Sequence, residues 1–117
     1  MIDLTDKQAS LVRSILKQYF PRGEAWVFGS RYNGCAKKSS DLDLALKSDR
    51  PLTLDELGLL DEAFENSSLP FRVDVVDYMS AGENFHAIIN KNSGLFYSSG
   101  MSADGEIQLE NKRTRRQ

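Results

Sequence analysis

The chain has 117 residues, of which 40% are hydrophobic and 27% charged, which predicts one ordinary globular domain with no room for a second, substrate-binding domain. Fifteen basic and 17 acidic side chains give a net charge of −2, which argues against a protein that holds nucleic acid through phosphate contacts over its whole surface. A single cysteine, Cys35, and a single histidine, His86, exclude an internal disulfide and a zinc site made of Cys and His ligands.

The first residues, MIDLTDKQAS, lack the basic start and the continuous apolar run of a signal peptide. No stretch approaches the roughly 20 apolar residues that span a bilayer. We therefore expect a cytoplasmic protein.

The first half of the chain predicts a helix followed by a strand. Apolar residues recur at three-and-four spacing through residues 4–19, as in an amphipathic helix, and Pro21 ends the pattern. Residues 25–28 form a short, β-prone run bounded by glycine, which predicts a buried strand that stops at Gly29-Ser30. A turn-rich stretch is expected next.

Residues 41–46 alternate with a period of two, which predicts a half-buried strand. Asp41, Asp43 and Ala45 fall on one face of that strand, and three leucines fall on the other. A capping box at Thr53 then predicts a helix over residues 53–66.

The run 71–76 is β-branched and alternating, and it places Asp74 on the less apolar face of a further strand. Strand parity puts Asp77 on the opposite face, as a loop residue or the start of a helix. A second capping box, residues 80–83, predicts a third helix that ends near Lys91, and residues 95–97 predict a last strand. These elements place the domain in residues 1–98, and we expect the polar, basic tail of residues 99–117 to be mobile.

Three carboxylates, Asp41, Asp43 and Asp74, lie on two strands that are expected to be neighbours. Converging hard oxygen ligands of this kind suit Mg²⁺, either as one ion or as two. Gly29-Ser30, directly after a strand, offers a close backbone approach, free N–H groups and a hydroxyl donor, which are the groups that bind a phosphate. Three basic residues follow in the same turn and could add positive charge: Arg31, Lys37 and Lys38.

The spacing of these residues resembles a known signature. Gly29-Ser30 followed by ten residues and then Asp41-Leu42-Asp43 is similar to the motif of the DNA polymerase β-like nucleotidyltransferase superfamily, and the stretch GSRYNGCAKKSSDLDLAL looks like its minimal, single-domain branch. The later PFRVDVVD resembles the strand that carries the third carboxylate of that family, which assigns this role to Asp74. The similarity covers roughly residues 5 to 98.

The resemblance implies an α/β (α+β) fold, a mixed sheet flanked by helices. It also implies ATP as the donor, two Mg²⁺ ions held by Asp41, Asp43 and Asp74, and phosphates held by Gly29, Ser30 and Arg31. The reaction would transfer AMP to a hydroxyl group and release pyrophosphate. Members of the minimal branch are often paired with a helical HEPN protein, an RNase toxin, which the nucleotidyltransferase neutralises as an antitoxin by adding AMP to a tyrosine.

Two other hypotheses stay open on the sequence. One is an adenylyltransferase that acts on a small hydroxylated molecule, although such relatives carry additional substrate-binding structure. The other is a non-catalytic module that masks its partner, for which loss of a carboxylate would be expected. All three carboxylates are present in this chain.

Overall fold

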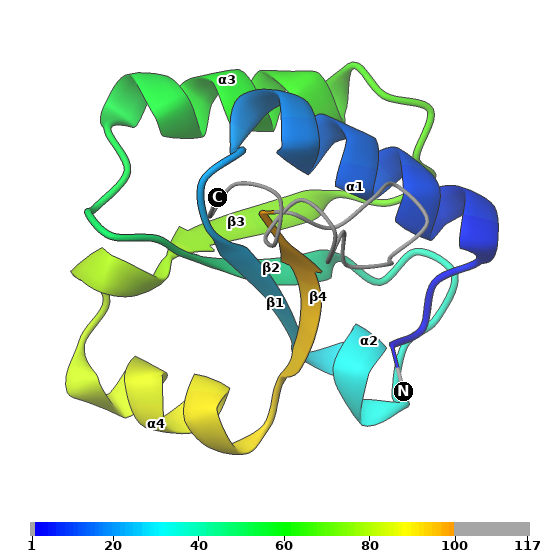
Figure 1. Ribbon diagram of the computed structural model, residues 1–117. Helices are drawn as coiled ribbons and strands as arrows, with labels where there is room; N and C mark the ends of the chain where they lie inside the picture. Colours follow the sequence, from blue (N-terminus) through cyan, green and yellow to red (C-terminus); the bar gives the residue numbers. More distant parts are fainter. Residues whose placement is uncertain (1, 100–117) are drawn as a thin grey trace, which may run out of the picture.

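A four-stranded mixed sheet in the order β3-β2-β1-β4 lies at the centre of the computed structural model, which describes residues 2–99 (Figure 1). Strand β1 is antiparallel to β2 and β4, whereas β2 and β3 are parallel, so the predicted mixed sheet is confirmed. The strands are β1 (Glu24–Phe28), β2 (Leu42–Lys47), β3 (Val73–Asp77) and β4 (Gly94–Ser98). The tail beyond residue 99, which we expect to be mobile, lies outside the described residues.

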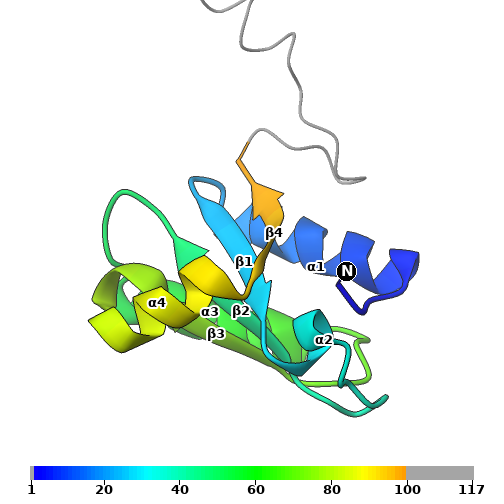
Figure 2. The ribbon, with the colours of Figure 1, turned by 90° about the horizontal axis from the view of Figure 1, so that it is seen from below.

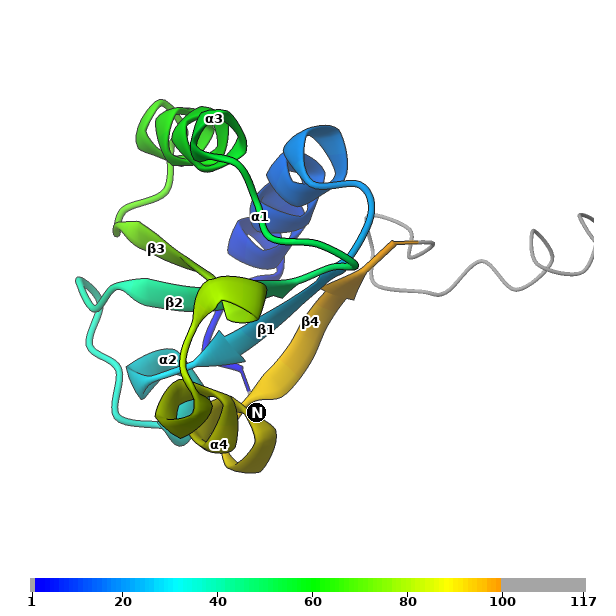
Figure 3. The same cartoon turned by 90° about the vertical axis from the view of Figure 1, so that its left-hand side faces the viewer.

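Helices cover the two faces of the sheet unequally (Figures 1 and 3). On one face, α1 (Asp6–Tyr19) and α3 (Leu54–Glu65) enclose the larger core. On the other face, the short helix η1 (Tyr78–Ser80) and α4 (Glu83–Lys91) cover a smaller cluster around Ala45, Tyr78 and Ile89. The larger core includes Val12, Leu16, Phe20, Val27, Leu42, Leu44, Leu46, Leu60, Phe64 and Phe96.

Local sequence signals explain the longer helices. Thr53 and Glu56 form the predicted capping box at the start of α3, and Thr5 and Gln8 form another at the start of α1. Helix α1 ends where the Phe20 N–H donates to the carbonyl of Leu16. None of the helices within residues 2–99 has the length and apolar character needed to cross a membrane.

The predicted half-buried character of β2 holds at Asp43 but is wrong at Ala45. Ala45 is fully buried, because η1 and α4 pack on the face that it shares with Asp43. Both faces of β2 are therefore covered around Ala45. Around Asp43, the face on which this residue lies is left open.

The capping box predicted for residues 80–83 is also wrong. Ser80 lies in η1 and donates its hydroxyl to Asp77 Oδ2 at 2.7 Å, and Gly82 is the N-cap of α4 without a side-chain hydrogen bond. Asp77 is buried and is the N-cap of η1, in agreement with its prediction as the start of a helix. Its carboxylate also accepts from the main-chain N–H groups of Leu52 and Met79.

The stretch expected as turn after Gly29 begins with a short helix, α2 (Ser30–Asn33), which continues directly from β1 (Figure 2). Gly29 is its N-cap and Gly34 its C-cap, both with a positive φ. The glycines at each end explain why only one turn of helix forms here.

Candidate active site

The two halves of the Gly-Ser and Asp-x-Asp motif meet at Gly29 and Asp43. Gly29 has a φ of +78°, and a Cβ atom at this position would collide with Asp43 Oδ2. Both the positive φ and the close approach require glycine. The main chain that leads into Ser30 therefore lies directly against a carboxylate oxygen of Asp43.

Asp43 and Asp74 are neighbours across the parallel strands β2 and β3, where the sheet register pairs them. Paired residues on adjacent strands project on the same face, so both carboxylates point to the open side of the sheet. Asp41 comes two residues before Asp43, just ahead of β2. Asp43 is half-buried, and Asp41 and Asp74 are exposed. We call these three residues the carboxylate cluster.

The electrostatics of Asp43 show that the three carboxylates influence one another. Burial raises the pKa of the Asp43 carboxyl above its ordinary value, and the negative charges of Asp74 and then Asp41 raise it further. Ionising Asp43 beside two other carboxylates is therefore costly without a cation. A bound divalent cation would lower the pKa of Asp43 instead of raising it.

The chemistry of the donor set fits a hard cation such as Mg²⁺, because all three residues supply carboxylate oxygens at a solvent-accessible surface. Within residues 2–99, no three His, Cys, Asp or Glu side chains are gathered closely enough to hold a metal by themselves. Binding would therefore require the exposed side chains of Asp41 and Asp74 to turn toward Asp43, with phosphate oxygens or water as the other ligands.

The side chain of Arg31 is not directed to the surface. The residue is 4% exposed, and its guanidinium donates to four main-chain carbonyls and lies 4.1 Å from the centre of the Phe71 ring. This arrangement leaves at most one of its five N–H groups for a phosphate. In contrast, Lys37 and Lys38 are exposed in the same loop.

Aromatic residues beside the carboxylate cluster have structural contacts. Phe28, which pairs with Asp43 across β1 and β2, packs edge-to-face against Phe85 of α4 with ring centroids 5.3 Å apart. His86 stacks on Tyr78, and its Nε2 lies 2.6 Å from the Tyr78 carbonyl oxygen. Periodicity gave no signal for this stacked pair, because it depends on how η1 turns into α4.

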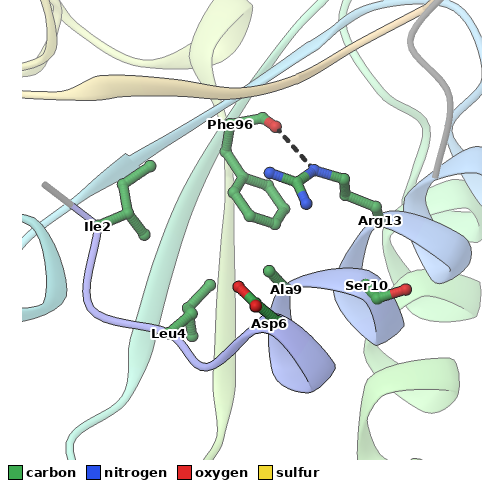
Figure 4. Close-up of a pocket in the computed structure, with 7 residues that line it drawn as sticks. All are labelled: Ile2, Leu4, Asp6, Ala9, Ser10, Arg13 and Phe96. Atoms are coloured by element: carbon green, nitrogen blue, oxygen red, sulfur yellow. Dashed lines mark hydrogen bonds between the residues drawn. The ribbon is translucent and has the colours of Figure 1, made fainter. Parts of the chain in front are cut away.

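A hollow of about 590 Å³ lies elsewhere (Figure 4). In this hollow, Arg13 covers the Phe96 ring and donates through Nε to the Phe96 carbonyl. No residue of the carboxylate cluster or of the Gly29-Ser30 turn contributes to its wall, which is formed by Ile2, Leu4, Asp6, Ala9, Ser10, Arg13 and Phe96.

Residues 11–100 match the family described as polymerase beta, nucleotidyltransferase. The chain belongs to this family. It is 44% identical over 90 residues to a probable protein adenylyltransferase MntA of Haemophilus influenzae, a match that covers 77% of this chain and 79% of the relative. The resemblance that the Gly-Ser and Asp-x-Asp residues predict is thereby confirmed, and with it a nucleotidyltransferase.

Solved structures share the fold of this nucleotidyltransferase. A toxin–antitoxin structure with AMP-PNP has a TM-score of 0.67 at 20% identity, covering 94% of this chain and 80% of that chain. A tri-AMPylated Shewanella oneidensis HEPN toxin in complex with an MNT antitoxin has a TM-score of 0.61 at 16% identity, covering 93% and 79%. At these identities, the similarity shows the fold alone.

Proposed function

We propose that this nucleotidyltransferase is an antitoxin that transfers AMP from Mg²⁺-ATP to a tyrosine hydroxyl of a HEPN RNase partner. The observation that carries the proposal is the close approach of Gly29 to Asp43, because the proposal assigns phosphate binding to the turn at Gly29 and metal binding to the Asp43 carboxylate. The relative at 44% identity, named a probable protein adenylyltransferase, supports a protein as the acceptor. The fold shared with toxin–antitoxin complexes supports a HEPN partner.

Each residue of the site has a role in this proposal. Gly29 and Ser30 bind the β- and γ-phosphates through main-chain N–H groups and the Ser30 hydroxyl. Asp41 and Asp43 would hold two Mg²⁺ ions, and Asp74 would complete the site next to the acceptor. When bound, the ions supply acidification of the hydroxyl and neutralisation of charge on the leaving group.

At the α-phosphorus, the reaction forms one bond and breaks one. The tyrosine oxygen gives up its proton to solvent and bonds to the α-phosphorus of ATP, and the bond from that phosphorus to the bridging oxygen breaks to release pyrophosphate. Asp74 lies on the edge strand β3 and is exposed, so a partner can bring its hydroxyl to the carboxylate cluster from the side of the sheet. Positioning of the reacting groups supplies most of the rate enhancement in such a transfer.

Intact mass spectrometry of a HEPN partner incubated with this protein and Mg²⁺-ATP tests the proposal. We expect the partner mass to rise in steps of one AMP. Asp74→Asn should stop the increase and leave complex formation unchanged, because it removes a metal ligand but little surface. Glu62→Gln, at an exposed carboxylate of α3, is the matched control and should behave as the wild type. No mass change with the wild type would refute the proposal.

A further inference from the structure

Arg31 is a buried cation without a carboxylate partner in the part of the chain that the structure describes. Buried charges are usually paired, because the loss of hydration must be offset. Here the charge is satisfied by main-chain carbonyl oxygens and by the face of the Phe71 ring. Such an arrangement fixes the main-chain segments that supply the carbonyls.

The four carbonyls come from two segments, the residues before α1 and the loop between α2 and β2. Nη1 donates to the Asp3 carbonyl at 2.9 Å, just before α1. Nε donates to the Ser40 carbonyl at 3.0 Å, and Nη2 donates to the carbonyls of Lys37 and Lys38 at 3.3 and 3.0 Å. Three of the four bonds therefore hold the loop that connects α2 to β2.

The position of Arg31 in the sequence links this loop to the site. Arg31 directly follows Ser30, and Ser40 directly precedes Asp41. The guanidinium thus ties the phosphate-type turn to the main chain that carries the first carboxylate. Two further hydrogen bonds hold the same segments together. The Asp3 N–H donates to the Arg31 carbonyl, and the Lys37 N–H donates to Ser40 Oγ.

We propose that Arg31 is a positioning residue that fixes Asp41 relative to Ser30 by clamping the loop of residues 34–40, without contact to the nucleotide. This inference rests on the proposed function for its kinetic part. A planar guanidinium with five donors satisfies carbonyls in several directions at once, whereas a lysine ammonium has three donors on a point charge. Arg31→Lys therefore keeps the positive charge but cannot make all four hydrogen bonds to these carbonyls.

Arg31→Lys and Arg31→Met test the clamp, with Arg13→Lys as the matched control. Arg13 also donates to a carbonyl and covers an aromatic ring, but it lies in the hollow of Figure 4. For Arg31→Lys we expect kcat for AMP transfer to fall at least about tenfold and the Mg²⁺ requirement to rise, with KM for ATP within about threefold of the wild type. Arg31→Met should lose about 100-fold in kcat, and Arg13→Lys should change neither constant.

Hydrogen exchange gives a readout that does not depend on AMP transfer. The amides of Lys37 and Ser40, which donate hydrogen bonds within this loop, should exchange at least about tenfold faster in Arg31→Lys and stay at the wild-type rate in Arg13→Lys. A rise of tenfold or more in KM with unchanged kcat would show a nucleotide contact and overturn the proposal, as would unchanged exchange in Arg31→Lys. If the wild type transfers no AMP, the proposed function fails, and the exchange rates alone decide whether Arg31 holds the loop.

Discussion

Two groups of charged side chains, the carboxylate cluster and the residues around Glu56, shift the pKa of an acidic residue in opposite directions. Glu56 Oε2 lies 3.0 Å from Arg50 Nη2 and 3.2 Å from Arg22 Nη1. These three residues form an ion-pair cluster. The hydrogen bond from Arg50, followed by that from the Thr53 N–H, lowers the pKa of Glu56 to about 2. In the carboxylate cluster, burial and then the negative charges of Asp74 and Asp41 raise the pKa of Asp43.

The two groups differ in where their counter-charges lie. The ion-pair cluster caps α3 and has its counter-charges in the folded chain. The carboxylate cluster has no counter-charge among the described residues at ion-pair distance. The raised pKa of Asp43 means that ionising this residue weakens the metal-free fold. A group of charges that costs stability is expected where a ligand supplies the missing charge.

The largest expected effect separates the two groups by activity. Asp43→Asn should lower the rate of AMP transfer by about 100- to 1000-fold or more, because it removes a carboxylate at the centre of the site. Glu56→Gln should stay within about threefold of the wild type. Initial rates with a HEPN partner and Mg²⁺-ATP measure both, and equal losses in the two variants would show that Asp43 has no special role in the reaction.

A smaller effect concerns the backbone that holds the carboxylate cluster. Gly29→Ala should destabilise the fold by about 1–3 kcal/mol, because alanine at a φ of +78° is strained and its Cβ collides with Asp43. Gly58→Ala is the control, since a Cβ there meets nothing within 4 Å in α3, and it should stabilise by about 0.5–1 kcal/mol. Urea denaturation measures both, and a neutral Gly29→Ala would contradict the close contact.

The raised pKa of Asp43 predicts a gain of stability on neutralisation. The folded-state pKa lies above the ordinary value of 3.8, so stability contributed by this residue falls as the pH rises from 3.8 through the folded-state pKa, and the full penalty is present at pH 7. In metal-free buffer at pH 7, Asp43→Asn should raise Tm by about 1–3 °C, a small effect because the group is only half-buried. A lower Tm of Asp43→Asn would contradict the raised pKa of Asp43.

Glu56 should respond to pH in the opposite direction. Its folded-state pKa of about 2 lies below the ordinary value of 4.5, so its stabilisation is present above pH 4.5 and is lost as the pH falls toward 2. Glu56→Gln should therefore lower Tm at pH 7, by less than Gly29→Ala does, and the difference from the wild type should shrink between pH 4.5 and 2. A difference that does not depend on pH would mean that packing, rather than charge, is lost.

Local patterns predicted the elements that local interactions determine. The box of Thr53 and Glu56, the Gly-Ser turn and the alternation at Asp43 and Asp74 all lie within a few residues of one another or follow strand parity. Ala45 could not be predicted as buried, because its cover comes from η1 and α4. The capping box predicted at Ser80 does not form, because the Ser80 hydroxyl donates to Asp77. Asp77 in turn accepts from the Leu52 N–H, which is distant in the sequence.

Arg31 shows the limit of sequence reasoning within the motif itself. A basic residue beside a Gly-Ser turn predicts a phosphate contact, and the turn-rich sequence around it supports that interpretation. Its burial depends on Asp3 and Phe71, which are far away in the sequence and come together only in the folded chain. The positions of the carboxylates were predictable, whereas the means of fixing them relative to Ser30 was not.

The most direct test of the account is whether the carboxylate cluster is needed to neutralise the partner. RNase activity of a HEPN partner is measured after incubation with Mg²⁺-ATP and either the wild type or the variant Asp41→Asn/Asp43→Asn/Asp74→Asn. We predict that the wild type abolishes the activity and adds AMP, and that the triple variant binds the partner but leaves it active. Full neutralisation by the triple variant with no change in partner mass would contradict the account and show a masking module instead.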